Sequence, residues 1–315
     1  MKPSKRPTPE PLKPPLARDG VGPSYVVLPE GPWQTIAQFL IERFPGVSAL
    51  VWNERMRAGD VIDEFGNSLD ARQPYQPHRK IYYFRSLEAE TRIPFDEQVL
   101  FHDDYLVVAD KPHFLPVIPS GRYLQETLLV RLKRKLGLET LSPIHRIDRE
   151  TAGLVIFTVR PETRHVYQDL FTRKQIHKSY EAIAPIRSDL VFPLTHRSRL
   201  VDNPENFMQS CEGPGVPNSE TQVELLEHTD SLARYRVTPI TGKKHQIRVH
   251  FAALGIPLLH DQIYPVHRAE NTDDYSKPLQ LLAQSIAFTD PITGTDRHFT
   301  SSRHLSLDHP GQSGA

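Results

Sequence analysis

The chain of 315 residues carries 38 Lys and Arg residues and 38 Asp and Glu residues, so its formal net charge at pH 7 is zero. Its length suits a larger domain with a smaller appended module, and 38% hydrophobic with 24% charged residues excludes a wholly disordered chain. The neutral balance gives no sign of a nucleic-acid partner, so any such claim must rest on local clusters of charge.

Cysteine usage and hydropathy restrict the compartment. Cys211 is the single cysteine, which excludes an internal disulfide and a thiolate zinc site and is typical of a reducing compartment. The N-terminus lacks the apolar stretch of a secretory signal, and no window approaches the roughly 18 apolar residues that span a bilayer. We therefore expect a cytoplasmic protein without a membrane partner.

The N-terminal part is expected to hold a tail and a small α/β module. Residues 1–24 are rich in proline and basic side chains, a composition that favours extended, solvated chain. The range 25–90 is predicted as one module with two amphipathic helices, at about 33–44 and 48–58, and a short strand that opens at Val61.

The larger part, residues 91–305, is predicted as one domain, and residues 306–315 as a flexible tail. Its expected strands are apolar and β-branched runs at 99–101, 105–109, 154–159, 180–184, 221–226, 232–238, 281–288 and 298–300. Its expected helices lie at 127–136, at 245–254 and from Pro161 onward, the last with Val166, Leu170 and Phe171 on its inner face. The fold class is α+β, a mixed and mostly antiparallel sheet with flanking helices.

The densest cluster of chemically active side chains is the run His145-Arg146-Ile147-Asp148-Arg149-Glu150, in a loop directly before a predicted strand. Positive charges at Arg146 and Arg149 would lower the pKa of Asp148 and keep it ionised. Asp148 is therefore available as a nucleophile or base. An ordinary surface ion-pair network is the alternative that the residues alone leave open.

Three other kinds of site are excluded because residues that they require are missing from the sequence. A kinase catalytic loop requires His-Arg-Asp with a glycine-rich loop and Asp-Phe-Gly, but Ile147 interrupts the triplet and the other two elements are absent. A phosphate-binding loop requires an earlier glycine and a final hydroxyl, and the run at Gly242-Lys243-Lys244 lacks both. His145 and Asp148 have no further ligands at a metal-binding spacing, so we expect no metal.

A second cluster joins a glycine turn to a helix, in the run Gly242-Lys243-Lys244-His245-Gln246-Ile247-Arg248. Free backbone N–H groups and the positive end of the helix dipole suit a phosphate there. A buried stripe of Ile247, Phe251 and Leu254 predicts that Gln246 and Val249 point elsewhere and that Arg248 can reach inward. A solvated arginine is the alternative.

A third cluster, Lys178-Ser179-Tyr180, opens a predicted strand. Simple core packing of the tyrosine ring, with its hydroxyl at the surface, is the alternative to a role in a site.

In this order the clusters resemble the RluA-type family of pseudouridine synthases. The run 145–154 is similar to the family's His-Arg-Leu-Asp-x-x-Thr-Ser-Gly-Leu, and 104–112 resembles its strand ending in Asn/Asp-Lys-Pro. The run 178–182 matches Lys-x-Tyr-x-Ala, and 242–250 matches Gly-Arg-Thr-His-Gln-Ile/Leu-Arg-x-His. Residues 30–90 are similar to the S4-type RNA-binding module that often precedes this domain.

Two positions depart from the family pattern. His260 precedes Asp261 where the family usually has Gly-Asp, and Pro265 replaces the glycine that usually follows the tyrosine. Both lie outside the motifs quoted above, and we expect them to alter loop shape or substrate choice.

The resemblance implies an isomerase that converts uridine to pseudouridine in rRNA or tRNA, as a monomer and without metal or organic cofactor. It implies that the uridine leaves its stack and that Arg146 enters the vacated space. Asp148 would attack the ribose or remove a sugar proton, Tyr180 would pack on the flipped base and serve in proton removal from C5, and Arg248 would pair with Asp148.

RNA contacts are expected from side chains of the same motifs, namely His145, Arg149, Lys178, Lys243, Lys244, His245 and Gln246. Further candidates for a phosphate track are Arg131, Lys133, Arg134, Lys135, Arg173 and Lys174. A catalytically silent RNA-binding protein is one alternative, but the four expected site residues are all present. A glycoside hydrolase is another, but it would need a second carboxylate at a defined separation, and only Glu150 is near.

Overall fold

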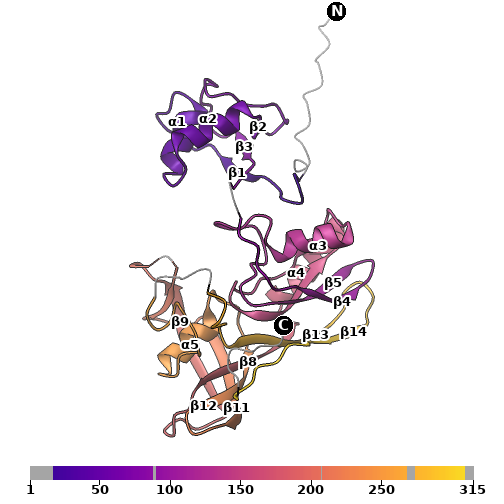
Figure 1. Ribbon diagram of the computed structural model, residues 1–315, viewed down its shortest axis with the longest axis vertical. Coiled ribbons are helices and arrows are strands. Elements are labelled where there is room, and N and C mark those ends of the chain that lie inside the picture. The colour runs from indigo at the N-terminus through magenta and orange to yellow at the C-terminus, as the bar shows by residue number, and fades with distance from the viewer. Residues whose placement is uncertain (1–16, 88–89, 207, 268–273, 309–315) are drawn as a thin grey trace, which may run out of the picture. The chain divides into compact units, whose positions relative to one another are not determined.

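The computed structural model describes residues 17–87, 90–206, 208–267 and 274–308, drawn as a ribbon in Figure 1. Most of the two predicted tails, residues 1–16 and 309–315, lies outside the described residues. In the part of the chain that is described, no helix is long and apolar enough to cross a membrane.

The chain folds into two compact units that divide between Glu90 and Thr91. Ser120–Gln125 belongs to the first unit, although it lies within the sequence of the second. Each unit has a hydrophobic core of its own.

The smaller unit packs two helices against a three-stranded antiparallel sheet in the order β1-β3-β2. Its elements are β1 Ser24–Val27, α1 Ile36–Arg43, α2 Ala49–Arg57, β2 Val61–Asp63 and β3 Lys80–Tyr83. Thr35 and Ser48 cap the helices, because each side-chain oxygen accepts the backbone N–H three residues on. Both predicted helices and the strand at Val61 are confirmed, whereas β1 and β3 were not predicted.

The expected disorder of residues 1–24 is wrong for its last part. Val21 is buried, and the Arg18 guanidinium lies 3.9 Å from the centroid of the Phe84 ring. Arg18 also forms an ion pair with Asp60. These contacts fold the chain onto the small unit before β1 begins.

The larger unit contains an 11-stranded sheet in the order β10-β9-β11-β12-β8-β13-β7-β5-β4, with β14 beside β13 and β6 beside β7. Among its named pairings only β13 with β7 is parallel. The bounds are β4 Gln98–His102, β5 Leu106–Lys111, β6 Ser142–Pro143, β7 Ala152–Thr158, β8 His177–Pro185, β9 Leu194–Asp202, β10 Ser210–Gly213, β11 Ser219–His228, β12 Leu232–Pro239, β13 Leu281–Thr289 and β14 Asp296–Thr300. This confirms the predicted mixed, mostly antiparallel α+β class.

Three α-helices accompany the sheet: α3 Leu128–Leu136, α4 Arg164–Thr172 and α5 Gln246–Ala253, with the 3₁₀ turn η1 Pro161–Thr163 before α4. The helix predictions are confirmed, but the inner face of α4 differs from the expected one. Tyr167 is fully buried there, with its hydroxyl satisfied by donation to the carboxylate of Asp290 at 2.9 Å, and Val166 is only half-buried.

Helix α5 is buried on two sides, which corrects the prediction of a single buried stripe. Ile247 and Phe251 join the core formed with β8, β11, β12 and β13, whereas Val249 packs with Ile263 and Tyr264 of the segment that follows the helix. In Figure 1 the helix lies beside β9 and β12. Gln246 and Val249 are therefore buried, not directed to solvent.

Strand register places one row of residues across β5, β7, β13 and β8. Lys111 pairs with Gly153, Gly153 pairs with Ala283, and Ala283 pairs with Tyr180. The loop that carries Asp148 enters β7 at this row, so Lys111 and Tyr180 flank the start of the strand from opposite sides.

Candidate active site

The loop before β7 is fixed by a buried lysine. The Lys111 ammonium donates to the carbonyls of Pro112, Leu115 and Arg149 at 3.0, 2.8 and 2.9 Å. Burial lowers the pKa of Lys111 to about 7. Because the three carbonyls belong to two loops, Lys111 ties the segment around Asp148 to the end of β5.

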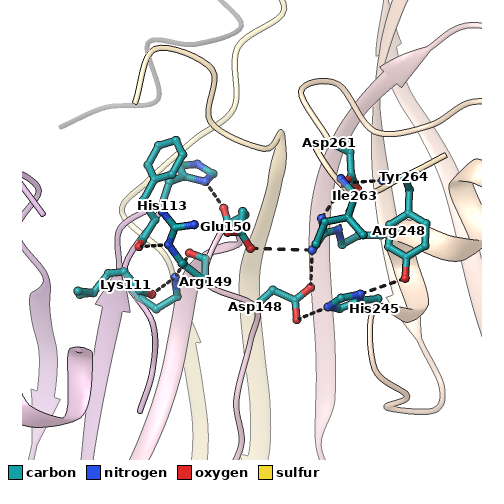
Figure 2. A network of polar contacts seen from close by, with 12 residues as sticks. Lys111, His113, Asp148, Arg149, Glu150, His245, Arg248, Asp261, Ile263 and Tyr264 are labelled. Atoms are coloured by element: carbon teal, nitrogen blue, oxygen red, sulfur yellow. Dashed lines mark hydrogen bonds and ion pairs between the residues drawn. The ribbon is translucent and has the colours of Figure 1, made fainter. Parts of the chain in front are cut away.

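Asp148 points from this loop toward the first turn of α5 (Figure 2). Its Oδ2 accepts a hydrogen bond from Arg248 Nη1 at 3.2 Å, and its Oδ1 lies 3.7 Å from His245 Nε2. Its side chain keeps 29% of its surface exposed, so a substrate can reach it.

Burial alone would raise the pKa of Asp148, but the charges of His245 and Arg248 and the hydrogen bond from Arg248 lower it below its ordinary value. Burial also lowers the pKa of His245, so its imidazole is neutral at neutral pH. Arg248 is then the lasting source of the positive field, and Asp148 is an ionised carboxylate.

Arg248 is itself held by a second carboxylate. Its Nε and Nη2 donate to Asp261 Oδ2 and Oδ1 at 2.8 and 2.7 Å, and both side chains are 1% exposed. Glu150 Oε2 lies 4.0 Å from Nη1 of the same guanidinium. Paired hydrogen bonds of this kind fix the plane of a guanidinium, so Asp261 aims Nη1 at Asp148.

Asp261 is held in turn by the backbone. Its Oδ1 also accepts the N–H groups of Ile263 and Tyr264 at 2.8 and 3.0 Å. Asp261 did not appear among the predicted site residues, because the sequence analysis considered only its neighbours His260 and Pro265, which lie outside the catalytic motifs.

His245 and Tyr264 complete the network. His245 Nδ1 lies 3.0 Å from the Tyr264 hydroxyl oxygen, which accepts the backbone N–H of Ser210 at 2.7 Å. Burial raises the pKa of Tyr264 to about 12, so this hydroxyl is protonated at neutral pH. Ser210 belongs to β10, and the network therefore reaches from Asp148 to the β9–β10 hairpin.

Tyr180 is half-buried on β8 and packs against the core that includes Ile247 and Phe251. Burial and then the negative charge of Asp148 raise the pKa of its hydroxyl. The strand register places Tyr180 beside Ala283, which pairs with Gly153 just after the loop of Asp148, and Arg248 binds Asp148 there. The expected pairing of Arg248 with Asp148 is confirmed.

Comparison with known proteins decides the family. The profile described as RNA pseudouridylate synthase matches residues 105–253, a range that includes Asp148 and Arg248. A tRNA pseudouridine synthase C of Pasteurella multocida is 32% identical over 216 residues, which are 62% of this chain and 87% of the relative. The chain belongs to the RNA pseudouridine synthase family.

Two further similarities, one to a relative in sequence and one to a solved structure, specify the type of catalytic domain and its fold. The dual-specificity RNA pseudouridine synthase RluA of Pasteurella multocida is 28% identical over 205 residues, covering 62% of this chain and 88% of the relative. This confirms the predicted RluA-type catalytic domain. The solved structure of human RNA pseudouridylate synthase domain containing 4 has the same fold, with a TM-score of 0.51 at 24% identity, covering 67% of this chain and 89% of that protein.

Within this pseudouridine synthase site, the expected RNA-binding residues divide into two groups. Arg146, Lys243 and Lys244 are exposed. Arg146 has no hydrogen-bond or ion-pair partner among the described residues. Lys178 is half-buried, and its ammonium lies 5.8 Å from the centroid of the Phe171 ring.

The others turn inward. Gln246 Oε1 accepts from the Thr241 hydroxyl and the Lys243 N–H, and its Nε2 donates to Glu220 and Thr221. All four hydrogen-bonding positions of this buried amide are used, so the prediction that Gln246 contacts RNA is wrong.

His145 and Arg149 also have internal partners. His145 Nε2 accepts the Ile156 N–H at 3.1 Å, and burial lowers the pKa of this ring to about 3. Arg149 donates to the Phe114 carbonyl and to Glu150. These contacts support the loop around Asp148. The sequence analysis assigned both side chains to RNA because contacts between distant segments cannot be derived from the motif alone.

The basic run on α3 is largely neutralised. Arg131 forms ion pairs with Glu97 and Glu126, Lys135 lies 3.6 Å from Glu97, and Lys133 is buried. Arg131 and Lys133 are therefore not available as a phosphate track.

One group of side chains in the described part of the chain has metal-ligand character. Ligand atoms of His196, Glu212 and His250 lie within 4.8 Å of one another. His196 Nε2 pairs with Glu212 at 2.7 Å, and His250 bonds Thr221 through Nδ1 and two serine hydroxyls through Nε2. These hydrogen bonds account for the group without an ion.

Proposed function

We propose that this protein isomerises uridine to pseudouridine in RNA and that Asp148 is its catalytic carboxylate. The observation that carries the proposal is the state of Asp148, which is ionised, partly exposed and bonded through Oδ2 alone. Its Oδ1 accepts no hydrogen bond from the described residues and is free to meet the ribose.

The reaction needs no net change of atoms or electrons. The C1′–N1 bond of the uridine breaks, the uracil turns, C5 joins C1′, C5 loses its proton and N1 gains one. A single carboxylate can serve as the nucleophile at the ribose or as the base that removes a sugar proton. Arg248 would hold Asp148 ionised and oriented through either course.

The target base must leave its stack before Asp148 can reach the sugar. Arg146 is exposed beside Asp148 in the sequence and has no partner in the described structure, which supports a role in the vacated space. Tyr180, half-buried on β8, is assigned to packing on the flipped base. Because the pKa of its hydroxyl is raised, Tyr180 is protonated at neutral pH. It would accept the C5 proton only while it gives its own hydroxyl proton to another acceptor.

The substrate is proposed to be tRNA or rRNA, since one relative is named a tRNA pseudouridine synthase and another a dual-specificity RNA pseudouridine synthase. Lys243 and Lys244, exposed at the start of α5, suit the phosphate backbone. We also retain as proposals an RNA-binding role for the S4-like unit and a cytoplasmic location.

The test uses unmodified tRNA and large-subunit rRNA transcripts tritiated at uridine C5. Isomerisation releases the tritium to water, and carbodiimide-dependent reverse-transcription stops locate the product. Asp148→Asn should abolish release, whereas Asp104→Asn, at a carboxylate that is 83% exposed, should leave it unchanged. Binding of these RNAs by the wild type without tritium release would replace the proposal with a silent RNA-binding protein.

A further inference from the structure

We propose that His245 is a positioning residue for Asp148, and that Tyr264 sets its imidazole tautomer so that Nε2 carries the proton facing Asp148 Oδ1. This inference rests on the proposed function, because it assigns a task at the same carboxylate. It adds His245 and Tyr264 to the residues that govern the reaction.

The first argument is backbone conformation. His245 precedes α5 with φ 56° and ψ 18°, the left-handed region, and its side chain makes no capping hydrogen bond. A residue at this position usually has extended backbone and caps the helix through its side chain, and the left-handed region is unfavourable for a non-glycine residue. This conformation directs the ring toward Asp148 and Tyr264, and such strain is commonly retained at functional sites.

The second argument is the number of hydrogens. The Tyr264 oxygen accepts the Ser210 N–H, so its hydroxyl hydrogen must find another acceptor. In the described part of the chain the remaining contact of that oxygen is His245 Nδ1, at 3.0 Å. If Nδ1 carried the proton, either two hydrogens would lie between these atoms, or the buried hydroxyl would turn away and have no acceptor among the described residues. Nδ1 is therefore the acceptor, and the neutral ring carries its proton on Nε2.

The third argument is the division of labour at Asp148. Arg248 binds Oδ2, whereas the polar contact of Oδ1 within the described part of the chain is His245 Nε2, at 3.7 Å. That distance is longer than a hydrogen bond, and catalytic hydrogen bonds often tighten only when substrate is bound. Contact between Nε2–H and Oδ1 would fix the rotation of the carboxylate about its Cβ–Cγ bond, so that it faces the ribose at one angle.

The hairpin β9–β10 is the outer support of this arrangement. Ser210 donates to Tyr264, and the Gln209 side chain donates to the carbonyl of Ile263 at 2.6 Å. The turn that holds Tyr264 is therefore anchored on one side by Asp261 and on the other by the hairpin.

The experiment compares His245→Gln, His245→Ala and Tyr264→Phe with the wild type. A matched control is Tyr235→Phe, because the buried Tyr235 hydroxyl donates to the Pro185 carbonyl at 3.1 Å, in the core and not in the network of Asp148. Two readouts are taken: kcat and KM for tritium release from the transcripts, and ¹⁵N chemical shifts of the histidine rings in the protein alone. The His245 signal is the one that His245→Gln removes.

We expect the wild-type ring to be neutral with its proton on Nε2, and Tyr264→Phe to give a mixture of tautomers. Tyr264→Phe and His245→Ala should lower kcat on the order of 10- to 100-fold with little change in KM, and His245→Gln, which can still donate, should recover part of the loss. Tyr235→Phe should keep both kcat and the tautomer.

A wild-type proton on Nδ1, or an unchanged kcat in Tyr264→Phe and His245→Ala, would overturn the proposal. Failure of the proposed function gives a different pattern, because the wild type then releases no tritium from any transcript. The ring shifts still test the assigned tautomer in that case, and the positioning role falls with the reaction.

Discussion

Asp261 and Arg248 share two hydrogen bonds at 2.8 and 2.7 Å, whereas Asp148 receives a single one from the same guanidinium at 3.2 Å. The carboxylate that we propose to react is thus the more weakly held of the two. A third carboxylate oxygen, Glu150 Oε2, lies 4.0 Å from Nη1 of the same guanidinium. The second carboxylate lets a buried arginine keep its charge while one donor stays directed at Asp148.

Asp261→Asn tests this support. The change removes a buried negative charge and one of the paired hydrogen bonds, and breaking a buried ion pair from one side costs about 3–5 kcal/mol. We expect a loss of stability of that order in urea unfolding, and a fall in kcat of about 100-fold because Nη1 is no longer aimed.

The matched control for Asp261→Asn is Asp189→Asn. Asp189 also pairs with an arginine through two oxygens, but both side chains are largely exposed. It should leave the urea midpoint and kcat unchanged. Equal effects of the two substitutions would contradict the role given to Asp261.

The pH dependence of activity should carry the signature of Asp148. Its pKa is lowered below the ordinary carboxyl value of 3.8, so it stays ionised as pH falls to that value and loses its charge only below it. We expect no carboxyl-dependent fall of kcat/KM between pH 8 and 5. In Arg248→Lys a single ammonium replaces the planar guanidinium, whose fork of donors binds Asp261 and Asp148 together. We expect the ammonium to stay with Asp261. The pKa of Asp148 then rises, and kcat/KM falls on the acid side of this pH range.

For Arg248→Lys the control is Arg236→Lys, at an exposed pair with Glu224. Its pH profile should match the wild type. An acid limb in the wild type that Arg248→Lys fails to move would assign the limb to another group.

Two neutral histidines, the buried His113 and the half-buried His145, make stability depend on pH. Burial lowers the pKa of His113 and of His145 to about 3 each, from an ordinary 6.5. Below pH 6.5 the unfolded chain binds protons that the folded chain does not, so stability falls as pH drops toward 3. Each ring contributes a slope of about 1.4 kcal/mol per pH unit.

The measurement is the urea midpoint at pH 7, 6 and 5. His145→Gln, whose amide oxygen can still accept the Ile156 N–H, should give a shallower slope than the wild type. Equal midpoints at the three pH values would refute the assignment of neutral rings.

The sequence predicts most helices and several strands well because their ends are marked by local chemistry. Gly137 stops α3 with φ 68°, and Thr127 caps its start. Strand β9 was not predicted because its residues are mostly Thr, His, Arg and Ser. It is held in the sheet by pairing with β10 and β11 and has no apolar pattern of its own.

Some residues of the candidate site were likewise predictable from the sequence and others were not. The pairing of Asp148 with Arg248, a hundred residues apart, was predicted only through the family motifs. Asp261 and Tyr264 could not be found by periodicity, because their contacts depend on burial of α5 from two sides. One signal was present: the Asp position is part of the family pattern that His260 interrupts, and His260 has φ 64°, a conformation that favours glycine.

Gly153→Ala tests whether the row through Lys111, Gly153, Ala283 and Tyr180 positions the site. Gly153 has φ 107°, and a Cβ there would lie 2.3 Å from the Ala283 carbonyl oxygen and 2.7 Å from its nitrogen. The backbones of β7 and β13 must then separate. We expect a loss of more than about 2 kcal/mol, and loss of tritium release because the loop of Asp148 enters β7 at this point.

Gly294→Ala separates this clash from backbone strain alone. Gly294 has φ 72° in the turn before β14, and no atom lies within 4 Å of a Cβ placed there. It should cost about 1–2 kcal/mol and leave kcat intact, since the turn is not part of the network. If Gly153→Ala were no worse than Gly294→Ala in urea and kept its activity, the close approach of β13 to β7 would not be what holds Asp148 in place.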